Sequence, residues 1–237
     1  MRLNIKCRVR SVSLVTGILF TALLTACMNE SSSAPSVSSD GTVATQEENT
    51  VVAEVTNIPP FEVIVYASDL PQDALFELDF MDDSASPSGK LIGLPNTGDE
   101  LDPPPESDPH VTFEVPVQAG IPYRCWIHMK VGTPKGKSQA NVIWVQFSDA
   151  VDESNREVLK LGTGSYLTVQ GPTQPGWTWV ACNFADSMPA GSLIYFRASA
   201  EITVQLQAGA EGVGFDQFVL SPLRFLEEGP LEPIVAK

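Results

Sequence analysis

The sequence predicts an all-β domain, an antiparallel sandwich or barrel with long loops, over residues 58–222. Short apolar segments recur along this region, separated by Gly, Pro, Asn and Asp turns. Several of them alternate apolar and polar side chains, as in Val111–Val117, which is typical of strands with one buried face. No segment shows a helical period of apolar residues over more than two turns. These observations favour many short antiparallel strands in one domain of sufficient length for a sizeable core.

Twelve strands are expected from the alternation and the turn signals. Within residues 123–131, Tyr123, Cys125 and Ile127 lie on one face and Trp126 lies on the other. Residues 68–110 are rich in Asp, Pro, Gly and Ser, and we expect mainly long loops there. The expected strands are residues 61–66, 76–80, 91–92, 111–117, 123–131, 141–147, 158–161, 166–169, 177–180, 193–198, 202–206 and 214–222.

The N-terminal residues have the pattern of an export signal. Four basic side chains within the first ten residues precede the mostly apolar, uncharged run Val12–Leu24. This run is shorter than the roughly 20 apolar residues that a spanning helix needs. It suits a signal peptide of residues 1–26, removed from the mature protein.

The four residues Leu24, Thr25, Ala26 and Cys27 resemble a bacterial lipobox. The resemblance implies cleavage after Ala26 and lipidation of Cys27, and hence an exported protein anchored by acyl chains to the membrane of the cell envelope. By resemblance to known sorting patterns, residue 28 is a Met and not the Asp that favours retention in the inner membrane, so we expect the outer membrane where one exists. The alternative is an ordinary secretory signal with a chance cysteine. Residues 27–57 are rich in Ser, Thr and Glu, and we expect a disordered tether.

Charge and motif content limit the classes of function. The net charge is −15, and it becomes −19 without residues 1–26, which hold four basic and no acidic side chains. Such acidity argues against a nucleic-acid partner. His110 and His128 have no metal-ligand spacing to Cys, Asp or Glu, and no nucleophile elbow or phosphate loop occurs. We therefore expect a protein that is not an enzyme.

Two cysteines remain in the predicted mature domain. Cys7 leaves with the signal peptide and Cys27 carries lipid, so Cys125 and Cys182 are left in a compartment that permits disulfides. They form either a disulfide or two buried thiols.

Aromatic side chains supply the candidate ligand-binding residues. Trp177 and Trp179 are two residues apart on one expected strand and share a face. Facing outward they would form a platform for a sugar ring, and facing inward they would belong to the core. Trp126 and Tyr166 are further aromatic candidates, and Asn183 could meet a sugar hydroxyl.

Asp216 is the one polar residue that needs a special explanation. It lies within the apolar closing strand 214–222, where a buried carboxylate requires a partner. That partner is a cation, a set of backbone N–H groups or an arginine.

The ordered motifs resemble the galactose-binding-like jelly rolls, in particular the carbohydrate-binding modules of families six and thirty-five. The residues that carry the resemblance are Val65–Asp69, Ala119–Trp126, Val145–Phe147, Leu161–Thr163, Gly176–Trp179 and Phe215–Pro222.

This resemblance implies a jelly-roll β-sandwich that binds a polysaccharide or other glycan without catalysis. It also implies one structural calcium ion held by Asp69 and Asp216, although Ala67 replaces a second acid of the pattern. The alternative function is an envelope scaffold or adhesion lipoprotein with a degenerate glycan site, which binds a protein partner through residues 80–110. Residues 223–237 are expected to form a C-terminal tail.

Overall fold

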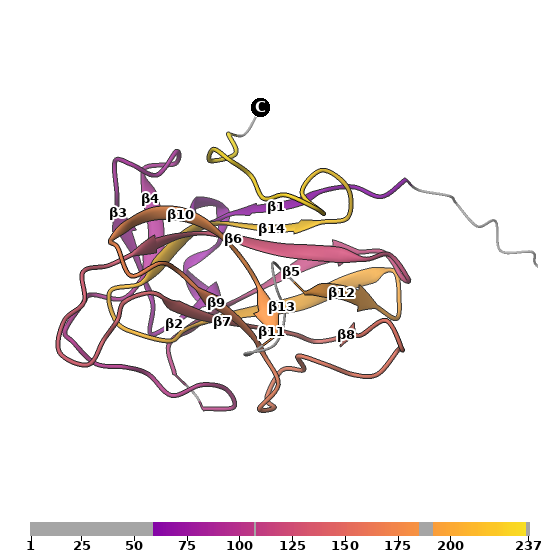
Figure 1. Cartoon of the computed structure of the whole chain (residues 1–237), viewed down its shortest axis with the longest axis horizontal. Helices are drawn as coiled ribbons and strands as arrows, with labels where there is room; N and C mark the ends of the chain where they lie inside the picture. Colours follow the sequence, from indigo (N-terminus) through magenta and orange to yellow (C-terminus); the bar gives the residue numbers. More distant parts are fainter. Residues whose placement is uncertain (1–58, 107, 185–191, 236–237) are drawn as a thin grey trace, which may run out of the picture. The chain divides into compact units, whose positions relative to one another are not determined.

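The protein folds into two antiparallel β-sheets that pack face to face, seen as two layers in the computed structural model (Figure 1). The structure describes residues 59–106, 108–184 and 192–235. Within these ranges there is no α-helix, and hence none long and apolar enough to cross a membrane. The predicted β-sandwich is confirmed. The predicted signal peptide, Cys27 and the tether lie outside the described residues.

We name the two sheets after their central strands. The β6 sheet contains β3 (Asp79–Asp82), β4 (Lys90–Gly93), β14 (Gly214–Ser221), β6 (Tyr123–Val131), β12 (Leu193–Phe196) and β8 (Ala150–Val151), with β1 (Val63–Tyr66) on β14 and β10 (Gly176–Ala181) on β6. The β7 sheet contains β11 (Asn183–Phe184), β9 (Leu167–Gln170), β7 (Val142–Phe147), β13 (Ala200–Ala208), β5 (His110–Val117) and β2 (Leu75–Phe76). From β4 to β14, successive strands alternate between the two sheets, as in a jelly roll.

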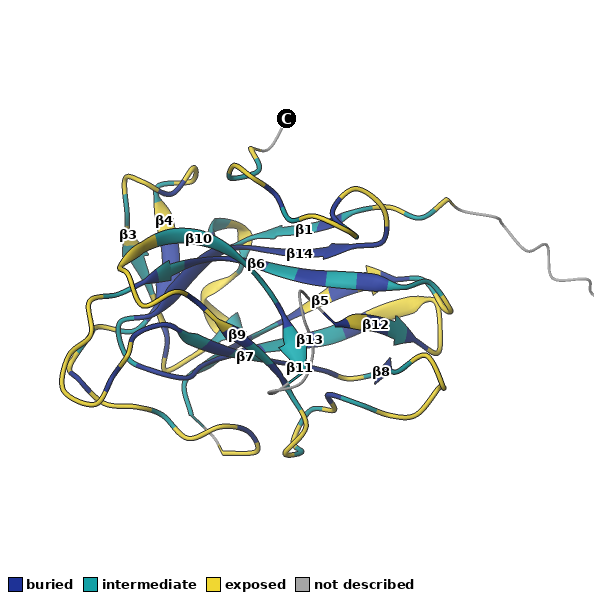
Figure 2. Cartoon of the chain, in the orientation of Figure 1, coloured by how far each residue is buried: buried dark blue, intermediate teal, exposed yellow. Residues whose placement is uncertain are grey.

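The core lies between the sheets and consists of the inward half of each alternating strand. On β6, Cys125, Ile127 and Met129 are fully buried, as the alternation predicts. Figure 2 shows the buried segments in dark blue, concentrated along the central strands of both layers. The aromatic rings of Phe113 and Phe218 join the sheets edge to face, with centroids 5.3 Å apart.

One expected strand is wrong. Residues 158–161 form a loop because Leu159 has a φ of +57°, which a strand cannot include. The Leu159 carbonyl accepts a hydrogen bond from Phe147 N at 2.8 Å, and the Leu159 side chain is buried. The segment thus contributes to the core without strand geometry. The two-residue strands β8 and β11 were not expected.

The closing strand β14 contains a β-bulge at Asp216. Phe215 pairs with Met129 and Gln217 pairs with His128, so Asp216 is an extra residue between two regular pairs. A bulge interrupts the strict alternation of side chains along a strand. As a result Asp216 and Gln217 are both directed to the side of the sheet on which His128 lies.

Cys125 and Cys182 lie together in the core. Both are free thiols in the structure, with their sulfur atoms 2.8 Å apart, and Cys182 N donates to Cys125 O at 3.0 Å. Burial raises the pKa of the Cys182 thiol well above its ordinary value, and the neighbouring Cys125 adds to this effect. The structure brings the pair together as buried thiols, and their disulfide stays a prediction.

Replacing Phe218 by Ala should destabilise the domain strongly. Its ring is completely buried between the sheets, and a Phe→Ala change in a core typically costs about 3–5 kcal/mol. The measurement is the free energy of unfolding from urea titration. Leu231→Ala is the control, because that side chain is 96% exposed and should change stability by less than about 0.5 kcal/mol. Equal effects of the two substitutions would contradict the described core.

Candidate functional site

Trp177 and Trp179 face away from the core, on the outer side of the β6 sheet. In the pairing of β10 with β6, Trp177 stands opposite Lys130 and Trp179 opposite His128. The β6 residues between them, such as Met129, are in the core. Both tryptophans are half-buried. The sequence left open whether the two indoles face outward or into the core, and in the structure they face outward.

His128 lies between these two tryptophans. Its imidazole stacks on Trp177, with ring centroids 4.8 Å apart and an interplanar angle of 15°. On Trp179 the centroid distance is 5.0 Å and the rings are tilted by 40°. Stacked aromatic contacts of this kind fix the orientation of both indoles relative to the sheet.

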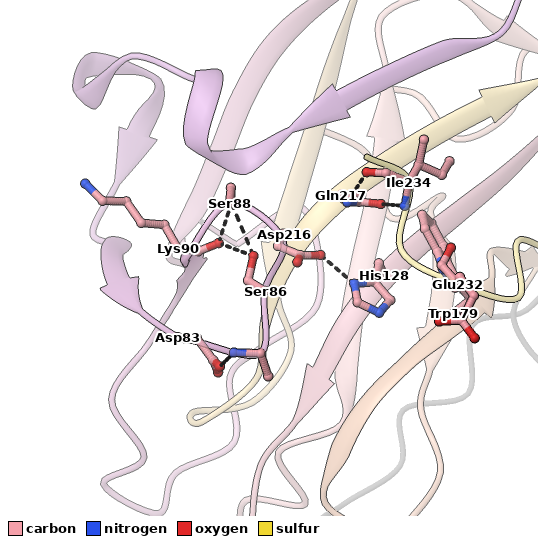
Figure 3. A network of polar contacts seen from close by, with 11 residues as sticks. Asp83, Ser86, Ser88, Lys90, His128, Trp179, Asp216, Gln217, Glu232 and Ile234 are labelled. Atoms are coloured by element: carbon pink, nitrogen blue, oxygen red, sulfur yellow. Dashed lines mark hydrogen bonds and ion pairs between the residues drawn. The ribbon is translucent and has the colours of Figure 1, made fainter. Parts of the chain in front are cut away.

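Asp216 reaches the same histidine. The distance between His128 Nδ1 and Asp216 Oδ1 is 2.6 Å, and the side chains are only 4% and 1% exposed (Figure 3). A hydrogen bond to an ionised group is shorter and stronger than one between neutral groups. Asp216 Oδ2 is also buried, and within the described part of the chain it has no hydrogen-bond partner. The partner of Asp216 is thus a histidine on the neighbouring strand, which was not among the expected partners.

An ion pair lies beside Trp177. The Lys130 ammonium contacts the Asp83 carboxylate from the loop that joins β3 to β4. Burial raises the pKa of Asp83, but the hydrogen bonds from Lys130 and Ala85 N and the Lys130 charge outweigh it, so the pKa is lower than usual. The nearby Trp177 indole N–H lowers this pKa further, without the geometry of a full hydrogen bond. The ion pair therefore stabilises the loop at pH values above the ordinary pKa of a carboxyl group. This stabilisation is lost as the pH falls through the lowered pKa of Asp83.

The C-terminal segment, residues 223–235, lies over the same face of the sheet. The Trp126 indole N–H donates to Phe225 O at 2.8 Å, and that of Trp179 donates to Glu232 O at 3.2 Å. Between the segment and the sheet is an open groove of about 380 Å³. It is lined by Ala85, His128, Trp177, Thr178, Trp179, Pro230, Leu231, Glu232 and Pro233.

Tyr166 and Asn183 lie on the other sheet. Tyr166, which directly precedes β9, contacts Trp144 edge to face, with ring centroids 5.8 Å apart. Asn183 pairs with Thr168 of β9. Trp144 pairs with Thr168 from the other side and is half-buried. The five predicted ligand-binding residues are thus divided between two sheets, with Trp126, Trp177 and Trp179 on one of them.

The structure also adds residues that sequence reasoning missed. His128, Lys130 and Trp144 were not singled out as site residues, yet each lies beside a predicted one. The position of His128 was detectable, because it alternates with the core residues of its strand and shares a face with Trp126. Its contact with Asp216 was not, because that contact depends on the bulge.

The residues predicted to hold calcium do not form a clear metal site. Asp69 ends the 3₁₀ turn η1 (Ala67–Asp69), is exposed, and accepts a long hydrogen bond of 3.4 Å from Ser68. Asp216 is engaged with His128. Among the residues described, no three His, Cys, Asp or Glu side chains gather closely enough to hold a metal ion. The calcium ion stays an implication of the sequence resemblance.

Comparison with known proteins gives similarities to solved structures at low sequence identity and low TM-score. No family model and no curated protein matches the sequence. The chain is similar to the GH26-CBM35 beta-(1,4)-mannanase of Podospora anserina, with 15% identity and a TM-score of 0.40, over 69% of this chain and 28% of that chain. It is similar to the C-terminal family 6 module of a marine laminarinase from Zobellia galactanivorans, with 10% identity and a TM-score of 0.39, over 68% and 99%. It is also similar to the family 35 carbohydrate-binding module of Clostridium thermocellum, with 14% identity and a TM-score of 0.34, over 67% of this chain and 98% of that chain.

Replacing either member of the buried His128–Asp216 pair by Leu should destabilise the protein by about 3–5 kcal/mol, because the other member is left buried without its partner. The double replacement should cost less than the sum of the two single ones, since it leaves no unpaired charge. Urea unfolding of the four proteins measures this coupling. Arg156→Ala, which breaks an exposed pair with Asp152, is the control and should have little effect. Additive effects of the two Leu substitutions would show that the pair is not energetically coupled.

Proposed function

We propose that the protein binds carbohydrate without catalysis, at the groove between β10 and the C-terminal segment. The observation that carries the proposal is the outward, half-buried pair Trp177 and Trp179 on the border of an open groove. The apolar face of a pyranose ring packs on an indole in the way that apolar surfaces pack on aromatic rings. His128 holds both indoles in position, so little side-chain freedom would be lost on binding.

Polar groups around the indoles can meet the hydroxyl groups of a sugar. Glu232 lines the groove, and the Asp83–Lys130 ion pair lies next to Trp177. Ligand sites usually combine an apolar floor with a small number of fixed polar groups. The groove has this composition and is open to solvent.

Binding without bond cleavage agrees with the position of the acids. Asp216 is buried and held by His128, and Asp83, whose side chain is 9% exposed, is paired with Lys130. Glycoside hydrolysis requires two carboxyl groups on either side of the scissile bond. A carboxylate engaged in a buried pair beneath the two indoles does not meet this requirement.

Replacing Trp177 or Trp179 by Ala should weaken retention on a polysaccharide found by a broad glycan array about ten-fold or more, because the stacking surface is lost. Affinity electrophoresis with that polysaccharide measures the change. Trp144→Ala is the matched control, since this half-buried tryptophan lies on the β7 sheet. Unchanged retention of both β10 variants, or loss of binding only in the Trp144 variant, would refute the proposed site.

We also propose that the domain is held at the cell envelope by acyl chains on Cys27. The support is the basic start, the apolar run and the four residues that end at this cysteine. Cys27→Ser should abolish incorporation of labelled palmitate and shift the protein from the membrane fraction to the soluble fraction. Cys7→Ser is the control and should leave both unchanged. A Cys27→Ser protein that still incorporates label would contradict lipidation at this residue.

A further inference from the structure

Two cysteine side chains meet in the core at the point where the chain passes from one sheet to the other. Cys182 is the single residue between β10, which belongs to the β6 sheet, and β11, which belongs to the β7 sheet (Figure 1). Cys125 lies near the start of β6, and its carbonyl accepts a hydrogen bond from Cys182 N at 3.0 Å. The pair therefore connects this crossover to the central strand of the β6 sheet.

The strand register brings the two sulfur atoms into contact. Ala181, the last residue of β10, pairs with Trp126, so Cys182 follows directly beside Cys125. The sulfur atoms lie 2.8 Å apart, and both side chains are completely buried. A disulfide needs two Cβ atoms directed at each other across about 3.5–4.5 Å. Because the register sets this juxtaposition, the bond can close by rotation of the two side chains.

The crossover is a place where a covalent link would restrain the fold. Among the described strands, β10 has β6 as its one pairing partner. Beyond Cys182, Ser192 N donates to Cys182 O at 3.2 Å, and the two-residue strand β11 pairs with β9. Strands with one partner open more readily than central strands. A bond at Cys182 would hold the end of β10, the strand of Trp177 and Trp179, against β6.

We propose that Cys125 and Cys182 form a structural disulfide as the chain folds, which fixes the crossover from β10 to β11 onto β6 and is sealed from reductants in the folded protein. The oxidant is a small-molecule disulfide or a thiol oxidoreductase. One cysteine thiolate attacks a sulfur of the oxidant, which gives a mixed disulfide and releases the first thiolate of the oxidant. The second cysteine thiolate attacks the mixed disulfide and releases the other. Two protons leave the cysteines, and two electrons reduce the oxidant to two thiols.

Burial determines when this reaction takes place. Burial raises the pKa of the Cys182 thiol well above its ordinary value, and the neighbouring Cys125 adds to this effect. The thiolate is the reactive form, so the pair reacts slowly once the core has closed, whereas the thiols of the unfolded chain are exposed and ionise normally. Oxidation therefore precedes or accompanies closure of the core. The same burial then protects the finished bond from exchange.

The test uses the full-length chain with Cys7→Ser and Cys27→Ser, which leaves Cys125 and Cys182 as its cysteines. This chain is unfolded and reduced in urea, freed of reductant and refolded with a mixture of reduced and oxidised glutathione. Free thiols are then alkylated with iodoacetamide in urea and counted by mass spectrometry. We expect a monomer without alkylated cysteine, and alkylation of both residues after renewed reduction. The proposal does not depend on carbohydrate binding. It rests on the proposed export only for the oxidant in the cell, which the test supplies.

Two further measurements examine the shielding and the effect of the bond. Dithiothreitol should reduce the disulfide of the folded chain at least about 100-fold more slowly than that of the chain in urea, because the sulfur atoms are inaccessible. The oxidised chain should have a Tm about 5–15 °C above that of the reduced chain. The matched control is the same chain with Cys125→Ala and Cys182→Ala, whose Tm should not respond to dithiothreitol. Near-UV circular dichroism verifies that the control is folded, and the thiol count does not require it.

Three results would overturn the proposal. Alkylation of both cysteines in the chain refolded with glutathione would show that the pair remains as thiols. Equal rates of reduction in the folded and unfolded chain would place the bond outside the closed core. Equal Tm values of the oxidised and reduced chain would show that the bond does not restrain the crossover.

Discussion

The β-bulge at Asp216 is the constraint on which the candidate site depends. In a regular strand Asp216 and Gln217 would project to opposite sides of the sheet. The extra residue between the pairs Phe215–Met129 and Gln217–His128 directs both polar side chains to the outer face. Asp216 then binds His128, and Gln217 binds the main chain of Ile234. Without the bulge, one of these two polar side chains would enter the core.

The consequences extend from the bulge to the surface of the protein. Because Asp216 holds His128 through Nδ1, the imidazole ring has a fixed place against which Trp177 and Trp179 pack. These indoles in turn border the groove beneath the C-terminal segment. A buried hydrogen bond thus orients a half-buried aromatic surface. Breaking it would alter the surface as well as the stability of the sheet.

The proposed carbohydrate site and the C-terminal segment use different parts of the same face of the β6 sheet. A sugar ring would use the aromatic faces of Trp177 and Trp179, whereas the C-terminal segment uses main-chain contacts to Gln217 and to the indole N–H groups. Trp179 contributes to both through different atoms. The position of the segment would therefore influence the access of a sugar to the two indoles.

The fold class and the inward faces of the main strands could be predicted from the amino-acid pattern, because alternation along a strand indicates which side chains are buried. The opposite directions of Ile127 and Trp126 could be predicted in this way. The strand expected at residues 158–161 was wrong. Leu159 has a positive φ, and an apolar residue type such as Leu gives no indication of this in the sequence. Local pattern also could not show that Tyr166 and Asn183 belong to a different sheet from Trp177.

The residues of the site are brought together by contacts between distant parts of the chain. The contact between Asp216 and His128 joins residues 88 positions apart, and that between Gln217 and Ile234 depends on the same bulge. Strand pairing and register are non-local, so no stretch of sequence encodes them alone. The residues expected to be a tail are a further case. Their place on the sheet follows from donors and acceptors that the folded sheet presents, and these groups converge only when β6, β10 and β14 are assembled.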